Sequence, residues 1–284
     1  MPIITLTTDW QTRDYYSGMM KGRLLTLVPE AVVIEINQLI EPFHILQAAF
    51  ILQQVLPEYS DGTIHLLLVN KGHQPGIWPS VVKYRNQFLV GWDDGVLPLV
   101  MTSDPDYYLR LDYSTLEKID QAACIDGRYK YIEPSFPELS LFSRIARFIS
   151  MGFSLDSAGP NTYGSGRSTL WQPVIQKHQI DGQVVFIDSY RNAITNIPKT
   201  EFLRIGTDRT FEITIKSNRY KIHGINATYM ESDPGELLAI FNSAGLLEIA
   251  IAQGNAAELL GFEPGTPIKI KFDEPLTSQA RKMQ

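Results

Sequence analysis

Short apolar runs alternate with longer helical stretches over the first quarter of this chain, and no other feature constrains its fold as strongly. Residues 3–7, 31–36 and 63–69 are apolar runs of strand length, so they predict three buried strands. Between them, apolar side chains recur at helical spacing over 16–27, and a second helix is predicted over 44–57. This order predicts a largely parallel sheet covered by helices on both faces.

The rest of the first half continues the same α/β pattern. Residues 80–92 predict a β-hairpin, which is followed by a tight Asp-Asp-Gly turn at 93–95. An amphipathic helix is predicted over 139–151. The next segment, 154–174, is rich in Ser, Gly and Pro and predicts a linker. We therefore expect an α/β domain over residues 1–153.

The second half has a different pattern, in which short β-like runs follow one another with frequent turns. Such spacing is typical of a small antiparallel barrel or sandwich. We expect a small all-β barrel domain over residues 175–284. The runs are 182–188, 192–197, 209–215, 236–241, 245–251 and 266–272.

Composition excludes several classes of function. The net charge of −6 argues against a nucleic-acid backbone as the main partner, because such binding depends on clustered Lys and Arg. One cysteine, Cys124, cannot form an internal disulfide and suits a reducing compartment. The first residues resemble no signal peptide, and no apolar run has the length of a membrane span. These features predict a cytoplasmic protein that binds neither membranes nor nucleic acid.

Asp9 is the first candidate functional residue. It follows the predicted strand 3–7, and ligands of open α/β sheets bind at the carboxyl ends of the strands. A carboxylate there can accept two hydrogen bonds from the vicinal diol of a ribose. The alternative is that Asp9 caps the next helix, which is expected to open near Thr12 to Asp14.

The stretch from Thr8 to Gly22 resembles the opening motif of the S-adenosylmethionine (SAM) hydroxide adenosyltransferases, a superfamily that includes the fluorinases and chlorinases. The resemblance implies that Asp9 binds the ribose hydroxyls of SAM. Trp10 and Gln11 depart from the usual Phe-Gly. The matching residues are Thr8, Asp9, Thr12, Asp14, Tyr16, Gly18, Met20, Lys21 and Gly22.

Two segments of the second half resemble the same family. Residues 184–197 match a pattern that ends in Asn-x-x-Thr-Asn-Ile, although Arg191 replaces a glycine, and residues 241–261 match a second pattern. The resemblance implies that these segments grip the adenine and methionine parts of SAM from the neighbouring subunit of a homotrimer. SAM or adenosine is then substrate or ligand, and no cofactor or metal is expected. The implied ligand-binding residues are Asp9, Asp188, Tyr190, Asn192, Asn242, Ser243, Asn255 and Ala256.

The catalytic positions of the family are substituted in this chain. The hydrolase branch uses an Asp, an Arg and a His to hold and activate water. Here Asn70, Ile77 and Asp126 stand at those positions. Asn70 cannot take a proton and Ile77 cannot stabilise a hydroxide, whereas Asp126 could act as a base if its pKa were raised.

Three functions remain open on the sequence. The first is a SAM hydroxide adenosyltransferase that cleaves SAM at C5′ to adenosine and methionine, with activity weakened by the substitutions. The second is an inactive homologue that binds SAM or adenosine, and the third is an adenosyl-transfer enzyme with another nucleophile. Lys71 and His73 could form a replacement water-activating set with Asp126, or could belong to a solvated polar loop.

Overall fold

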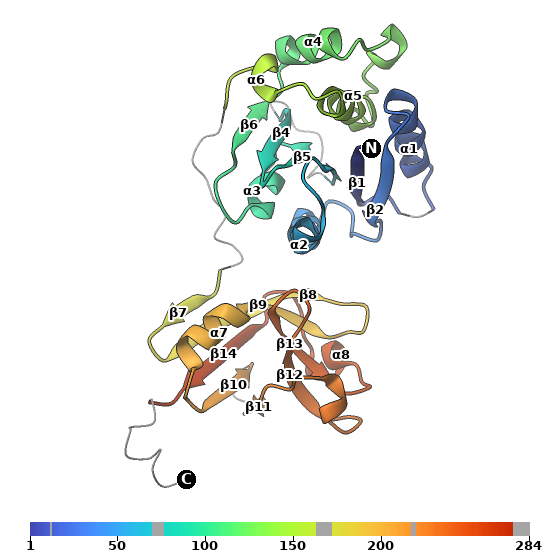
Figure 1. Cartoon of the computed structure of the whole chain (residues 1–284). Helices are drawn as coiled ribbons and strands as arrows, with labels where there is room; N and C mark the ends of the chain where they lie inside the picture. Colours follow the sequence, from blue (N-terminus) through green and yellow to red (C-terminus); the bar gives the residue numbers. More distant parts are fainter. Residues whose placement is uncertain (12, 70–76, 163–171, 217–219, 275–284) are drawn as a thin grey trace. The chain divides into compact units, whose positions relative to one another are not determined.

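The chain folds into two compact units, Met1–Ser168 and Thr169–Gln284 (Figure 1). The computed structural model describes residues 1–11, 13–69, 77–162, 172–216 and 220–274. Each unit has a hydrophobic core of its own and is treated by itself below.

The first unit is built on a six-stranded sheet that is mostly parallel. The strand order is β2-β1-β3-β5-β4-β6, with parallel pairing from β2 through β5 and antiparallel pairing of β4 with both neighbours. This confirms the expected parallel sheet and the hairpin. The strands are β1 (Ile3–Thr8), β2 (Val32–Asn37), β3 (Ile64–Leu68), β4 (Pro79–Tyr84), β5 (Gln87–Trp92) and β6 (Tyr107–Arg110).

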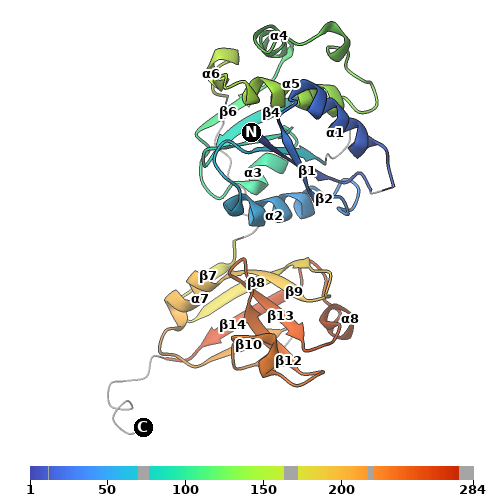
Figure 2. The ribbon, with the colours of Figure 1, turned by 45° about the vertical axis from the view of Figure 1, so that its right-hand side comes forward.

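Helices cover both faces of this sheet, which is why its central strand β3 is buried throughout and apolar except for His65 (Figures 1 and 2). On β3, Ile64, Leu66 and Leu68 face one core, whereas Leu67 lies in the other. The first core is covered by α1 (Tyr16–Leu27), α4 (Tyr113–Ala122), α5 (Glu138–Ser150) and α6 (Leu155–Ala158), and the second by α2 (Ile45–Val55) and α3 (Val96–Val100). Single-turn 3₁₀ helices are Leu56–Glu58 and Gly127–Tyr129.

A polar run crosses the buried middle of the sheet. The Thr5 hydroxyl lies 2.7 Å from His65 Nδ1, and His65 Nε2 lies 3.2 Å from Gln87 Oε1. These residues belong to β1, β3 and β5, and all three are buried. Hydrogen bonding at both ring nitrogens offsets the cost of burying the imidazole, so His65 is a satisfied sheet residue.

The second unit is a nearly closed antiparallel barrel. Its strand order is β11-β10-β14-β8-β9-β13-β12, with β7 beside β8. The Asn226 N–H donates to Ala239 O of β12 at 2.8 Å, which ties the segment after β11 to the other edge. The elements are β7 (Val174–Gln176), β8 (Gln179–Ile187), β9 (Ala193–Pro198), α7 (Lys199–Gly206), β10 (Phe211–Ile215), β11 (Tyr220–Ile222), a 3₁₀ turn (Tyr229–Glu231), β12 (Leu237–Phe241), β13 (Leu246–Ile251), α8 (Ala256–Leu260) and β14 (Pro267–Phe272).

The boundary region between the expected domains contains more structure than its composition suggested. Helix α6 lies inside the expected linker 154–174, and the Thr162 N–H donates to Tyr108 O at 2.7 Å. The Gly-Ser-Gly at 164–166 lies outside the described residues. Helix α1 begins at Tyr16, later than the expected Thr12 to Asp14, and Thr12 is also outside them.

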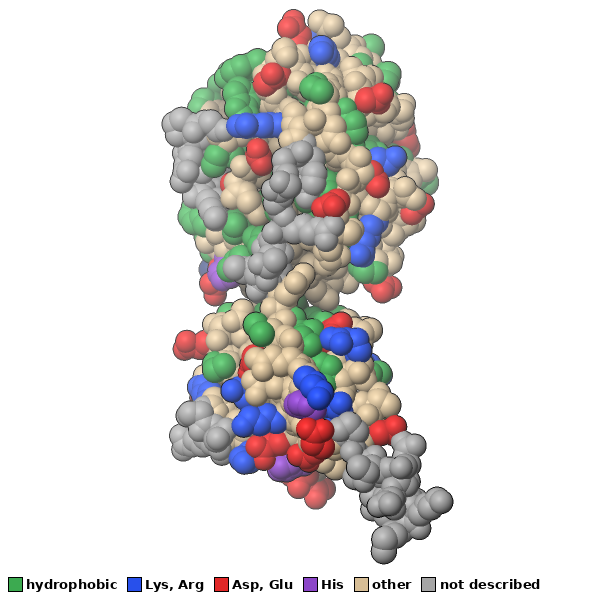
Figure 3. Space-filling view, turned by 90° about the vertical axis from the view of Figure 1, so that its left-hand side faces the viewer, with side chains coloured by type: hydrophobic (Ala, Val, Ile, Leu, Met, Phe, Trp, Pro, Cys, Tyr) green, Lys and Arg blue, Asp and Glu red, His purple; other side chains and the backbone are tan. Residues whose placement is uncertain are grey.

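Charges of both signs are interspersed on the face of the second unit shown in Figure 3. Ion pairs such as Lys221–Glu212 at 2.9 Å and Lys269–Asp181 at 3.6 Å place cations beside acids. Among the described residues, no helix combines the length and the apolarity that crossing a bilayer would require.

Candidate functional site

Asp9 lies directly after β1, at the carboxyl-terminal edge of the parallel sheet. Its Oδ2 accepts a hydrogen bond from the backbone N–H of Phe43 at 2.8 Å. Burial raises the pKa of Asp9, and backbone N–H donors, including that of Phe43, lower it in part. Helix α1 is capped by Tyr15 with no side-chain hydrogen bond. Asp9 therefore holds the loop that leads to α2 and does not cap α1.

Aromatic side chains surround the residue that follows Asp9. The Trp10 ring lies 5.9 Å, centroid to centroid, from both Tyr16 and Phe136. Phe136 lies two residues before Glu138, the first residue of α5. Burial raises the pKa of Glu138 to about 7, and the negative charge of Asp9 contributes to the rise. Asp9 is half-buried and Glu138 is buried, and of these two acids the sequence analysis found only Asp9.

Of the three substituted catalytic positions, the structure describes Ile77 and Asp126. Asn70, together with Lys71 and His73, lies outside the described residues. Ile77 is half-buried and packs against the first core of the sheet. Asp126 is exposed, and its Oδ1 accepts the Arg128 N–H at 3.0 Å as the cap of a 3₁₀ turn. The side chains of Ile77 and Asp126 are therefore occupied by packing and by a local turn.

A cavity of about 660 Å³ opens at one end of the barrel. Tyr190 and Asn192, from the turn between β8 and β9, line it together with residues 229–230, 232–234 and 251–254. Tyr190 is 79% exposed, whereas Asn192 is buried. The cavity therefore combines an exposed aromatic ring with a fixed amide, a combination that suits a flat polar ligand.

A buried acid, Glu248 of β13, organises the polar groups behind this cavity. Its Oε1 accepts from the Tyr229 hydroxyl at 2.7 Å, and its Oε2 accepts from Asn242 Nδ2 at 3.3 Å. Burial raises the pKa of Glu248, whereas hydrogen bonds from Tyr229, Asn242 and Asn192 lower it in part. Asn192 also lies beside Asp188, whose Oδ1 accepts its backbone N–H at 2.8 Å and whose Oδ2 lies 3.5 Å from its Nδ2.

The remaining predicted ligand residues have local structural roles. Asn242 Oδ1 accepts the Ala244 and Leu246 N–H groups in the turn between β12 and β13, where Ser243 is exposed. Asn255 caps α8 by accepting the Glu258 N–H at 2.9 Å, and Ala256 is buried at the start of that helix. In the described barrel, Tyr190 and Asn192 line the cavity directly. Asp188 is connected to it through its hydrogen bonds with Asn192, and Asn242 through Glu248, which accepts from Tyr229.

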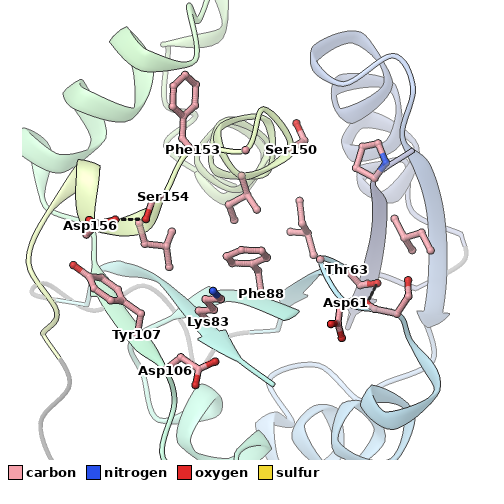
Figure 4. Close-up of a pocket in the computed structure, with 18 of the residues that line it drawn as sticks. Asp61, Thr63, Lys83, Phe88, Asp106, Tyr107, Ser150, Phe153, Ser154 and Asp156 are labelled. Carbon is pink, nitrogen blue, oxygen red and sulfur yellow. Dashed lines mark hydrogen bonds between the residues drawn. The ribbon is translucent and has the colours of Figure 1, made fainter. Parts of the chain in front are cut away.

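A larger cavity, of about 860 Å³, lies at the opposite edge of the first sheet. Figure 4 shows Lys83 and Phe88 at its base, with Tyr107 and Asp156 on one side and Asp61 and Thr63 on the other. Its lining includes the amino-terminal ends of β1 and β3 and contains none of the predicted site residues. Ligands of open parallel sheets bind at the other edge, so its size alone does not make it the site.

The fold and these sites define a class of protein: an α/β unit with a carboxylate at the strand ends, joined to a small barrel with a polar, aromatic-lined cavity. Sequence comparison identifies the class. Residues 4–159 match the SAM hydroxide adenosyltransferase N-terminal domain, and residues 182–269 match the C-terminal domain. The chain belongs to the SAM hydroxide adenosyltransferase family.

Similar proteins span nearly the whole chain. An (R)-S-adenosyl-L-methionine hydrolase of Salinispora arenicola is 27% identical, with 95% of this chain and 97% of that protein covered. The protein of the same name from Thermus thermophilus is 25% identical over 93% of this chain and 97% of its own length. The crystal structure of an uncharacterized conserved protein from Thermotoga maritima superimposes with a TM-score of 0.79 at 26% identity, covering 95% of this chain and all of that one.

Proposed function

We propose that this chain binds SAM and cleaves it with water at C5′, giving adenosine and methionine. The observation that best supports this proposal is the position of Asp9 at the carboxyl end of β1, in a fold of this family. Its carboxylate accepts a hydrogen bond from the Phe43 N–H. A ribose diol would donate two hydrogen bonds to the ionised carboxylate. Hydrogen bonds to a charged acceptor contribute about 1.5–3 kcal/mol.

The reaction would be an in-line displacement. The water oxygen forms a bond to C5′ while the bond from C5′ to the sulfonium sulfur breaks, and the sulfur keeps the electron pair as the neutral thioether of methionine. The attacking water loses its proton to solvent or to a base. A positioned base is worth about 10²–10⁴ in rate, whereas correct positioning contributes about 7–11 kcal/mol. A chain that positions SAM can therefore turn it over slowly without the full catalytic set.

Ile77 and Asp126 favour slow turnover over efficient hydrolysis. Ile77 packs on the core and has no charge with which to stabilise a hydroxide. The carboxylate of Asp126 is exposed and caps a 3₁₀ turn. The same two observations support a second candidate function, a SAM- or adenosine-binding protein without turnover. The third reading, transfer of the adenosyl group to another nucleophile, needs an acceptor other than water.

For adenine we propose the barrel cavity, with Asn192 as the reader of the base. The Asn192 side-chain nitrogen lies between the carboxylates of Asp188 and Glu248. Carboxylates accept hydrogen bonds and cannot donate when ionised, so the amide NH₂ faces them. Its Oδ1 is then left to accept a hydrogen bond from the ligand, as the 6-amino group of adenine would provide.

We further propose a homotrimer in which Asp9 of one chain and the barrel residues of its neighbour form one site. The family resemblance supports this assembly. Light scattering of the purified chain at micromolar concentration tests it, and a monomeric mass would contradict it.

The deciding experiment incubates the purified protein with SAM and chromatographs the products, while calorimetry measures the binding of SAM and adenosine. Slow formation of adenosine and methionine in equal amounts supports the hydrolase. Binding without products supports the second candidate. Absence of binding by both compounds at millimolar concentration would overturn the ligand assignment.

A further inference from the structure

Glu138 is a buried carboxyl to which the proposed reaction assigns no task. It is the first residue of α5 and only 3% exposed. Its Oε2 has no hydrogen-bond partner within the described residues. An orphaned polar atom in the interior is costly. A buried acid beside a proposed ligand site is a candidate functional group.

Three ion pairs join acids to cations of α1 and α5, the helices on this side of the sheet. Arg23 of α1 donates to Glu133 at 2.6 Å, and Arg144 of α5 donates to Asp120 at 2.7 Å. Lys21 of α1 pairs with Glu35 of β2 at 2.6 Å. No cationic side chain in the described part of the chain forms an ion pair with Glu138.

The groups that bear on the protonation of Glu138 are mostly anionic. Burial is the largest cause of its raised pKa, its own backbone N–H opposes the rise, and the charges of Asp9 and Glu133 add to it. The Tyr16 ring lies 3.8 Å from that of Phe136, and its hydroxyl is neutral near pH 7, since the hydrogen bond with Tyr15 raises its pKa above the ordinary value of 10.0. Glu138 and Asp9 are thus two carboxyls within electrostatic range of each other, and neither forms an ion pair with a cation in the described part of the chain.

The proposed ligand would bring a charge to this pair. In SAM the sulfonium is attached to C5′ of the same ribose whose 2′ and 3′ hydroxyls would bind Asp9. The sulfonium would therefore lie within the electrostatic range of both carboxylates. A neutral thioether in the same place would bury two like charges with nothing to offset them.

We propose that Glu138 is a specificity-determining carboxyl that favours a cationic adenosyl sulfonium over a neutral adenosyl thioether. The inference rests on the proposed ribose site at Asp9. When Glu138 is ionised, a cationic ligand compensates the pair, whereas a neutral ligand binds only as the carboxyl takes up a proton. The preference for the cation therefore grows as pH rises through neutrality.

The matched probes are SAM and S-adenosylhomocysteine, which differ by one methyl group and by the sulfonium charge. Calorimetry near pH 6 and near pH 8 gives the ratio of their Kd values, and chromatography of each sample afterwards excludes turnover. For the native protein we expect the preference for SAM to rise about tenfold between the two pH values, the equivalent of one pKa unit. Glu138→Gln should keep the ratio constant within about twofold.

The control is Glu30→Gln, which removes an exposed acid from the loop between α1 and β2 and should behave like the native protein. Binding of both probes with a ratio that does not change with pH would overturn this inference and leave the proposed function standing. Absence of binding by both would overturn the proposed function together with the inference. If the Gln variant does not fold, the native ratios alone decide.

Discussion

Asp9 accepts a hydrogen bond from the backbone N–H of Phe43, and Phe43 itself has a left-handed backbone, with φ of 65°. Such a conformation costs a bulky residue about 1–3 kcal/mol and persists only where surrounding contacts impose it. The Phe43 side chain is 62% exposed, so core packing of the ring does not impose it. The hydrogen bond to Asp9 helps to hold Phe43 in this conformation, and it links the carboxylate to the loop before α2.

Replacing Asp9 tests the ribose assignment. Asp9→Ala should weaken adenosine binding by roughly 1.5–3 kcal/mol, because hydrogen bonds to a charged acceptor are lost. Calorimetric titration measures the change. Asp61→Ala is the matched control, since it removes a carboxylate from the cavity at the opposite edge of the sheet. Equal effects of the two changes would contradict the assignment.

Restoring the family's catalytic residue types should raise turnover. The combined change Asn70→Asp, Ile77→Arg and Asp126→His should increase adenosine formation from SAM, measured by chromatography. Each single change should do little, because groups that act as one unit are strongly non-additive. The gain can fall short of a full hydrolase, since a misplacement of ~1 Å can cost about 10²-fold. Rapid hydrolysis by the native protein would sink this prediction; Asp126→Asn and His73→Ala would then identify a substitute base.

The orientation of Asn192 should let the protein distinguish adenosine from inosine. Inosine presents a carbonyl where adenosine presents an amino group, so two acceptors would face each other. We expect inosine to bind more weakly by about 1–3 kcal/mol, the cost of an unsatisfied buried polar group. Glu248→Gln should reduce the difference between the two affinities. The new glutamine amide can either donate or accept a hydrogen bond, so it no longer holds the Asn192 amide in one orientation. Equal calorimetric affinities of the native protein for the two nucleosides would refute the orientation.

Glu138 should make the stability of the protein fall as pH rises. Its pKa is raised from an ordinary 4.5 to about 7 in the folded chain. The folded state therefore holds a proton that the unfolded state releases between these values. That contribution is complete below about pH 4.5 and is lost as pH rises through about 7, a change of roughly 3 kcal/mol. Urea unfolding of native and Glu138→Gln protein across this range measures it; parallel profiles would contradict the prediction.

His65 should make the stability of the protein rise as pH rises, the opposite of the effect of Glu138, over nearly the same pH range. Burial lowers its pKa from 6.5 to about 4, although the hydrogen bond with Gln87 opposes the shift. The unfolded state then binds a proton that the folded state excludes, so this contribution is present above about pH 6.5 and is lost as pH falls through about 4. His65→Gln should remove that slope from the urea-unfolding profile. A variant profile that still falls at acid pH by the native amount would exclude His65 as its source.

Much of the fold could be predicted from periodicity. The largely apolar run of β3 and the alternation between strands and helices indicated the parallel sheet. The frequent turns of the second half indicated the barrel. Short elements such as α3 and α6 escaped, because four or five residues carry too little periodicity. Helix α4 was not predicted, although the sequence holds a signal for it: Asp112 is a typical capping residue, and in the structure it accepts the Thr115 N–H at 2.8 Å.

The candidate site was predicted only where side-chain type carries the function. Asp9 was predicted from its place after a strand, and Tyr190 and Asn192 from the family resemblance; the structure places the first at the strand edge and the other two in the lining of the barrel cavity, while their binding roles stay predictions. Phe43 was missed because it contributes a backbone N–H, which no residue type encodes. Glu138 looked like an ordinary acid in the first turn of a helix. Glu248 did leave a signal, as a lone acid within the apolar run of β13.

The polar run from Thr5 through His65 to Gln87 fixes the register of strands β1, β3 and β5. Sliding β3 by one residue along β1 would turn His65 toward the opposite face and leave its ring nitrogens without partners. Alternative alignments of these apolar strands are thereby penalised. Because Thr8 is held opposite Leu68 in the same ladder, the alignment chosen in the middle of the sheet also fixes how far Asp9 projects beyond the end of β3. The loops at that edge can thus diverge in sequence while the acid keeps its place.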